Sequence, residues 1–334
     1  MRTILLIATG GTIASRPTAA GGLAPAITSQ ELLSCVPELA EFCRIDAIQL
    51  YNLDSTNMGP EQWQGIAAAV QENYDRYDGF VITHGTDTMG YTAAALSYMI
   101  QKSPKPVVLT GSQKSIYNRD TDARNNLWRA VAYACHPDAW GVQIVFDNQV
   151  ILGTRARKTR TKSFNAFSSI DYPETAMFRD RRLIQFLQRP AEYTHAVFST
   201  ALDPNVFVLR LVPGMRADII PMLEGRYRAL VLESFGVGGI PQRLMDAFAE
   251  ELGDYDKTHK ILILTTQVTY EGSDVGIYEV GKRVKNRFRF LEAHDMTIEA
   301  VVTKVMWLLA QNCENFDQLQ QRFYRQINFD TFYH

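Results

Sequence analysis

Short apolar runs of strand length alternate along this chain with amphipathic stretches of helical length. The runs are apolar almost throughout, which is typical of parallel strands covered on both faces. They span residues 3–8, 79–83, 106–110, 142–146, 206–211, 229–233 and 260–265. The helical stretches span residues 60–74, 91–101, 121–135, 241–250 and 297–311. This alternation predicts an α/β fold with largely parallel sheets.

The alternation breaks down between residues 179 and 205. This stretch is polar, contains Pro190 and Pro204, and has weak periodicity, as is typical of a domain junction. We therefore expect an N-terminal domain over residues 1–190, a linker over 191–204 and a C-terminal domain over 205–334.

Charge and composition exclude several classes of function. A formal net charge of −2 argues against a nucleic-acid partner or an acidic membrane surface. No apolar window approaches the length of a membrane span. The start MRTILLIATGG fits the first strand of a cytoplasmic protein better than a signal peptide. The histidines are scattered and no CxxC pair occurs, so we expect no metal site, no cofactor and four free thiols.

The first apolar run ends in Thr9-Gly10-Gly11-Thr12. No third glycine follows and no P-loop is present, so a nucleotide-binding loop has little support. A second apolar run ends in His84-Gly85-Thr86-Asp87-Thr88. Each turn alone could be structural, with Thr and Asp as helix caps. In a parallel sheet both turns lie at the carboxyl edge, where ligands bind, and we expect them to face one crevice.

Six stretches in order resemble the bacterial-type L-asparaginases. The two signature motifs are TGGTIAS (9–15) and GFVITHGTDTM (79–89). The others are LDSTNM (53–58), PVVLTGSQ (106–113), ESFGVGGIP (233–241) and DMTIEAVVTKVMWLL (295–309). The resemblance covers nearly the whole chain, and the loop at residues 22–25 resembles the cytoplasmic type I branch. It implies a larger, flavodoxin- or Rossmann-like N-terminal domain and a smaller C-terminal domain.

The resemblance implies hydrolysis of L-asparagine to L-aspartate and ammonia, without a cofactor. Thr12 matches the family's nucleophile, which would form an acyl-enzyme, and Thr86 matches its second catalytic threonine. Asp87 and Lys158 complete the catalytic set. Lys162 competes with Lys158 for the lysine role, since basic residues crowd this stretch.

Substrate contacts also follow from the resemblance. Asp87 matches the residue that binds the α-ammonium group, Ser55 and Thr56 match positions that bind the α-carboxylate, and Gly85 lies beside them. The family often has glutamine at the position of Thr56, so the shorter side chain leaves that contact open.

Two departures from the family pattern stand out. Leu23 lies where many members carry a loop tyrosine, so either another group activates Thr12 or a tyrosine enters from elsewhere. Gly239 lies where a neighbouring subunit often contributes an asparagine. That contact is then made by backbone, or by Glu271 or Asp274. Residues 15–25 are rich in Gly, Ala and Pro and are expected to form a mobile lid.

The resemblance implies a homotetramer, a dimer of dimers with sites near subunit interfaces. Alternatives are a mixed asparaginase-glutaminase, a non-catalytic binding protein for aspartate or asparagine, and a nucleotide-dependent α/β enzyme. A role as part of a tRNA-dependent amidotransferase is disfavoured, because the extra N-terminal domain of that relative would have no room before Thr12.

Overall fold

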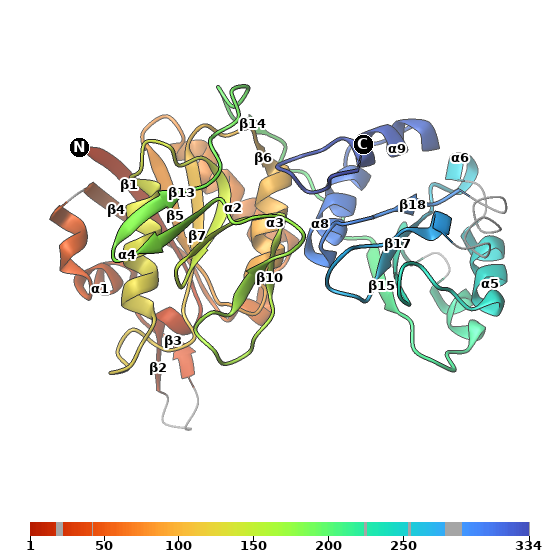
Figure 1. Ribbon diagram of the computed structural model, residues 1–334, viewed down its shortest axis with the longest axis horizontal. Helices are drawn as coiled ribbons and strands as arrows, with labels where there is room; N and C mark the ends of the chain where they lie inside the picture. Colours follow the sequence, from red (N-terminus) through yellow and green to blue (C-terminus); the bar gives the residue numbers. More distant parts are fainter. Residues whose placement is uncertain (18–22, 42, 224–225, 253–254, 278–288, 334) are drawn as a thin grey trace. The chain divides into compact units, whose positions relative to one another are not determined.

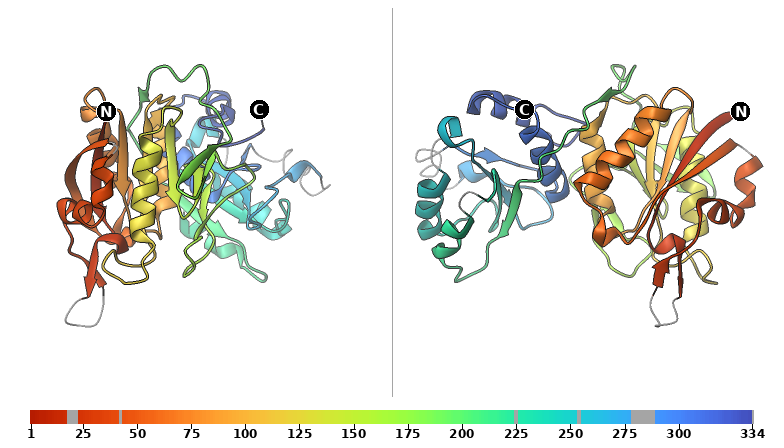
Figure 2. Two further views of the ribbon diagram at one scale, coloured as in Figure 1. Left: turned by 60° about the vertical axis from the view of Figure 1, so that its left-hand side comes forward. Right: turned by 180° about the vertical axis from the view of Figure 1, so that it is seen from behind.

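The computed structural model describes residues 1–334 except 18–22, 42, 224–225, 253–254, 278–288 and 334. It divides into two compact units, Met1–Thr200 and Ala201–His334, which Figures 1 and 2 show. Each unit carries its own sheet and its own hydrophobic core. The domain limits at residues 1–190, 191–204 and 205–334 stay a prediction.

An eight-stranded sheet forms the centre of the first unit, in the order β13-β12-β9-β8-β7-β5-β1-β4. Five of its strands are mutually parallel: β1 (Arg2–Gly10), β4 (Cys43–Leu53), β5 (Gly79–Thr83), β7 (Pro106–Thr110) and β8 (Gly141–Phe146). The other three run antiparallel to their neighbours: β9 (Gln149–Leu152), β12 (Ala176–Arg179) and β13 (Arg182–Gln185). The predicted largely parallel sheet is confirmed, with an antiparallel edge that the apolar runs did not indicate.

Helices cover both faces of this sheet (Figures 1 and 2). Helices α1 (Ser29–Ser34) and α4 (Ala123–Ala134) share one hydrophobic cluster on one face. Helices α2 (Pro60–Asn73) and α3 (Met89–Met99) lie on the other. Pro60 occupies the first turn of α2, where its missing N–H costs nothing.

Among the described residues, three two-stranded ladders and three 3-10 turns complete the first unit. The ladders are β2 (Ser15–Pro17) with β3 (Leu23–Pro25), β6 (Ile100–Gln101) with β14 (Val197–Phe198), and β10 (Ala156–Lys158) with β11 (Phe167–Ser169). The 3-10 turns are η1 (Thr12–Ala14), η2 (Pro37–Glu41) and η3 (Ser55–Asn57).

The second unit is a smaller α/β layer built on a parallel four-stranded sheet. Its strands are β15 (Val206–Arg210), β16 (Ala229–Ser234), β17 (Ile261–Thr266) and β18 (Leu291–Glu292). Its helices are α5 (Gln242–Leu252), α6 (Tyr255–Thr258), α8 (Ile298–Leu309) and α9 (Phe316–Tyr324), with 3-10 turns η4 (Ala217–Ile219), η5 (Pro221–Leu223) and η6 (Val275–Ile277). Thr297 caps α8 by accepting a hydrogen bond from the Ala300 N–H, as its residue type predicts.

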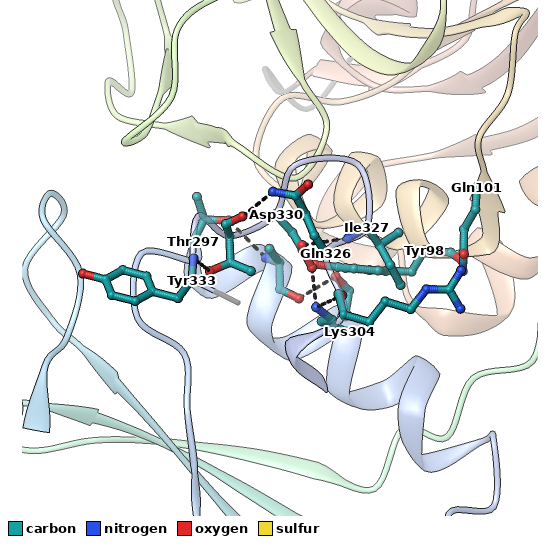
Figure 3. Close-up of polar contacts among 12 residues, drawn as sticks. Tyr98, Gln101, Thr297, Lys304, Gln326, Ile327, Asp330 and Tyr333 are labelled. Carbon is teal, nitrogen blue, oxygen red and sulfur yellow. Dashed lines mark hydrogen bonds and ion pairs between the residues drawn. The ribbon is translucent and has the colours of Figure 1, made fainter. Parts of the chain in front are cut away.

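A fully buried ion pair fastens the C-terminal residues to α8 (Figure 3). The Lys304 Nζ lies 2.6 Å from Asp330 Oδ2, and both side chains are 0% exposed. Nζ also donates to the Arg325 carbonyl oxygen at 3.0 Å, while Asp330 accepts from the Ile327 N–H at 2.9 Å. Burial lowers the pKa of Lys304, and the Asp330 carboxylate opposes this shift. These charges are therefore held by a network of hydrogen bonds inside the unit.

Within the described residues, no helix has both the length and the apolar character needed to cross a membrane.

Candidate active site

Two consecutive glycines allow the turn after β1 to pack backbone to backbone on its neighbours. A Cβ on Gly11 would lie 2.4 Å from the Gly85 nitrogen, and one on Gly10 would lie 2.5 Å from the Leu53 carbonyl oxygen. Both have positive φ, 108° and 79° for Gly10 and Gly11, so two requirements select glycine here. Thr12 follows at once, half-buried at the start of η1. The turns after β1, β4 and β5 thus meet at the carboxyl edge of the sheet.

The turn after β5 packs in the same way on the turn after β4. A Cβ on Gly85 would lie 2.6 Å from Ser55 Oγ, and the Thr88 hydroxyl donates to the Ser55 carbonyl oxygen at 2.7 Å. Ser55 is consequently buried. Thr56 is exposed, and its hydroxyl and N–H donate to the Asp54 carboxylate at 2.8 and 2.9 Å. Ser55 therefore lies in the wall of the candidate site, next to the turn after β5, while Thr56 contacts Asp54 within its own turn.

A lysine bridges two of the predicted catalytic side chains. Lys158, the last residue of β10, places Nζ 2.8 Å from Thr86 Oγ1 and 2.6 Å from Asp87 Oδ1. Thr86 is buried, whereas the Asp87 side chain is 62% exposed and that of Lys158 16%. Lys162 is exposed. The Asp87 carboxylate, the Lys158 amine and the Thr86 hydroxyl thus form a continuous line of hydrogen bonds.

Gln113 extends this line of hydrogen bonds, although the sequence predicted no role for it. Its Oε1 accepts from the Thr86 hydroxyl at 3.3 Å, and its Nε2 donates to the Ser163 carbonyl oxygen at 3.1 Å. The Asp122 carboxylate fixes this turn by accepting from the Gln113 N–H at 2.9 Å. Burial raises the pKa of Asp122, and its hydrogen bonds to backbone N–H groups oppose this. The sequence carried a signal for this residue. Gln113 ends the motif at residues 106–113, which contains β7, and β7 pairs with β5.

His84 supports the turn after β5 from below. Its Nδ1 lies 2.7 Å from the Gly85 carbonyl oxygen and its Nε2 lies 2.9 Å from the Thr92 hydroxyl. A carbonyl can only accept, so Nδ1 carries the proton and Nε2 accepts from Thr92. Burial lowers the pKa of His84 to about 4. The imidazole is therefore neutral at pH 7 and holds Gly85 in place.

The strand pair β2 and β3 extends from the Thr12 turn. Its base is anchored by Ser115, whose hydroxyl donates to the Ser15 carbonyl oxygen at 2.5 Å. Arg16 adds contacts with Glu31 at 3.0 Å and with the Tyr117 hydroxyl at 3.3 Å. The centre of the predicted lid, residues 18–22, lies outside the described residues.

The described part of the chain holds no group of three His, Cys, Asp or Glu side chains suited to a metal ion.

Comparison with known families agrees with this geometry. Residues 3–192 match the family model described as asparaginase, N-terminal, and residues 205–323 match the glutaminase/asparaginase C-terminal domain. The chain belongs to the asparaginase family. The family predicted from the sequence motifs is therefore confirmed.

Named relatives of this asparaginase-family chain fall into two groups. An L-asparaginase of Thermococcus kodakarensis is 38% identical over 96% of this chain and 97% of its own length. L-asparaginase 1 of Escherichia coli K12 is 33% identical over 94% and 93%. One component of the glutamyl-tRNA(Gln) amidotransferase of Metallosphaera sedula is 32% identical over 93% of this chain but 73% of its own length.

A solved structure shows the same fold. The thermostable L-asparaginase from Thermococcus kodakarensis superposes with a TM-score of 0.91 at 36% identity, covering 98% of each chain. The predicted architecture of a larger and a smaller α/β domain is confirmed.

Proposed function

We propose that this chain is an L-asparaginase, which hydrolyses L-asparagine to L-aspartate and ammonia through a threonine nucleophile. One observation carries the proposal. Lys158 Nζ lies 2.8 Å from Thr86 Oγ1 and 2.6 Å from Asp87 Oδ1. Thr86 and Asp87 belong to the turn on which the Gly11 backbone packs. A hydroxyl nucleophile needs such a proton-transferring partner, because it is weakly nucleophilic at neutral pH.

In the first step, Thr12 Oγ attacks the side-chain amide carbon of asparagine. Its proton passes to the departing nitrogen, which leaves as ammonia, and an aspartyl ester remains on Thr12. In the second step, water attacks this ester and releases aspartate. The Thr86–Lys158–Asp87 line supplies a relay for the protons of both steps. Backbone N–H groups at Thr12 and Thr86 hold the oxyanion, an effect of roughly 3 kcal/mol on the transition state.

Substrate binding uses the exposed end of this relay and the wall beside it. The Asp87 carboxylate, with most of its side chain in solvent, binds the α-ammonium group. Ser55 and the backbone of Gly85 face the α-carboxylate. Thr56 joins them only if its hydroxyl leaves Asp54, to which it donates at 2.8 Å.

The ammonia assay tests the reaction and the nucleophile together. We expect ammonia from L-asparagine with the unaltered protein, and none above background with Thr12→Ala. The exposed Thr194 provides the matched control, since Thr194→Ala should keep full activity. L-glutamine is assayed in parallel. Equal rates on both amides would assign a mixed asparaginase-glutaminase.

Two other outcomes would replace the proposal. Hydrolysis of glutamine alone would favour a role in an amidotransferase, the activity named for the relative from Metallosphaera sedula. No ammonia from either amide, with thermal stabilisation by aspartate, would identify a non-catalytic binding protein.

We further propose a cytoplasmic homotetramer, a dimer of dimers with sites near the subunit interfaces. All four cysteines are free thiols, which suits a reducing compartment. The oligomer itself rests on the family resemblance. Light scattering should return four times the 37.8 kDa chain mass, and a fully active monomer would refute this assembly.

A further inference from the structure

Three of the four cysteines gather around one hydrophobic cluster of the first unit. Cys43 belongs to this cluster, and Cys35 and Cys135 pack against it. Cys43 begins β4, the outermost strand, and Cys135 directly follows α4. All are free thiols. The proposed catalytic set uses none of them.

Backbone geometry brings Cys43 and Cys135 to the same corner of the sheet. Arg2 lies opposite Cys43 in the β1–β4 ladder, and its guanidinium donates to the His136 carbonyl oxygen at 2.9 Å. His136 is the residue after Cys135. In addition, a Cβ on Gly79, at the start of β5, would lie 3.2 Å from the Ala134 carbonyl oxygen. The end of α4 therefore lies over the starts of these strands.

The Cys43 and Cys135 thiols lie close enough to shift each other's pKa, and their surroundings differ. Cys43 is 2% exposed, and its sulfur also lies 3.7 Å from the Leu39 carbonyl oxygen. Cys135 is only half-buried. The neighbouring Cys135 thiol lowers the pKa of Cys43, while the Cys43 sulfur and burial raise the pKa of Cys135. Solvent thus reaches Cys135, and the thiolate of the pair forms on Cys43.

We propose that Cys43 and Cys135 form a reversible disulfide, a redox modification site of this asparaginase. The oxidant is a low-molecular-weight disulfide such as oxidised glutathione. The Cys43 thiolate takes the proton of the more accessible Cys135, whose sulfur displaces one glutathione thiolate and forms a mixed disulfide. The displaced glutathione thiolate then takes this proton from Cys43 and leaves as reduced glutathione. The Cys43 thiolate then attacks the Cys135 sulfur and displaces the second glutathione. Two protein thiols lose two electrons and two protons, and one oxidised glutathione becomes two reduced molecules.

This bond would join two elements whose other ends carry the site. Strand β4 leads from Cys43 to the turn that holds Ser55, and α4 begins beside Asp122, which fixes Gln113. Closing so long a loop restricts the unfolded chain strongly. We therefore expect oxidation to raise the midpoint of thermal unfolding by on the order of 5–15 °C. Activity at room temperature should stay within about twofold, because the bond forms at the edge opposite the site.

The test treats the reduced, folded protein with oxidised glutathione and removes the reagent. Intact mass should fall by about two mass units, peptide mapping without reductant should find Cys43 linked to Cys135, and dithiothreitol should reverse both. Cys135→Ser, at the more accessible position, should abolish the mass change and the rise in unfolding midpoint. Cys35→Ser is the matched control from the same cluster and should leave both intact.

Three results would overturn the proposal. One is a cross-link that contains Cys35 or Cys313. Another is a stable glutathione adduct without a protein cross-link. The third is no change of mass while the protein remains folded. A Cys43–Cys135 link that leaves the unfolding midpoint unchanged would disprove the stabilising effect.

Discussion

Two lysine–aspartate pairs, one in each unit, have the same contact length and opposite surroundings. Lys158–Asp87 and Lys304–Asp330 both join Nζ to a carboxylate oxygen at 2.6 Å. The first leaves Asp87 62% exposed, whereas both side chains of the second are 0% exposed. The exposed pair contacts a threonine hydroxyl, and the buried pair contacts backbone groups (Figure 3). Contact length alone therefore does not separate the proposed catalytic pair from a structural one. Surroundings do.

The largest expected effect tests the exposed pair. Lys158→Met removes the amine between Thr86 and Asp87, and asparaginase activity should fall at least about 10³-fold, or roughly 4 kcal/mol. The free energy of unfolding should change by less than about 1 kcal/mol, because the Asp87 carboxylate is open to solvent and does not need the lysine for its solvation. Steady-state ammonia release and urea denaturation measure the two quantities. Lys162→Met, at an exposed neighbouring lysine, should be as active as the unaltered protein. If Lys162→Met is inactive and Lys158→Met is active, the proposed role belongs to Lys162 and not to Lys158.

The buried pair should show the reverse pattern. Lys304→Met leaves the Asp330 carboxylate without its cation, and the free energy of unfolding should fall by about 3–5 kcal/mol. Activity per folded molecule should stay within about twofold. Lys260→Met is the control, since Lys260 pairs with Glu251 in a partly exposed contact of the same unit and should cost about 1 kcal/mol or less.

A double variant sharpens this measurement. Adding Asp330→Leu to Lys304→Met removes the unpaired charge and should restore part of the lost stability. No recovery would mean that packing rather than charge accounts for the loss.

His84 provides a buried ionisable group next to the exposed pair. Its folded pKa of about 4 lies below the ordinary value of about 6.5, so the unfolded state binds more protons between these pH values. The free energy of unfolding should therefore fall as pH is lowered through this window, by up to about 3 kcal/mol. Urea denaturation of His84→Gln should lack this component, while His195→Gln, at an exposed histidine, should retain it. Identical pH profiles for all three proteins would contradict the burial argument.

The smallest expected effect concerns the backbone that positions the exposed pair. Gly85→Ala places a Cβ 2.6 Å from Ser55 Oγ, and relieving this overlap should cost about 1–3 kcal/mol of stability. Activity should fall as well, because Thr86 follows directly. Gly59→Ala meets its nearest atom at 3.6 Å and should be nearly neutral. Thermal unfolding and ammonia release measure both variants. If Gly85→Ala changes neither stability nor activity, Ser55 moves aside at little cost in free energy, which would contradict this prediction.

Most strands that the sequence predicted are buried on both faces, although the partly exposed edge strand β15 was predicted too. The strands that the sequence missed are short or lie at a sheet edge. Residues 79–83 and 106–110 form strands with the predicted limits, because both are apolar throughout. Strand β4 lies at the sheet edge and is only partly buried, so polar residues interrupt it and no apolar run marks it. The antiparallel β13 is likewise half-exposed.

The candidate site divides in a similar way. Meeting turns after β1 and β5 follow from parallel topology alone. The choice of Lys158 came from resemblance, since it is one of several basic residues in its stretch. Gln113 escaped notice because its contact with Thr86 depends on how a third turn folds. Sequence periodicity does not report that geometry.

The packed glycines have a consequence for engineering. Gly10, Gly11 and Gly85 leave no room for a side chain, because main-chain or Ser55 atoms lie within 2.6 Å of each Cβ position. The floor of the site is thus set by main chain, and random substitution there will mostly yield inactive clones. A library that aims to change amide preference should hold these positions fixed. It should draw its diversity from exposed or half-buried positions such as Thr56 and Gln113.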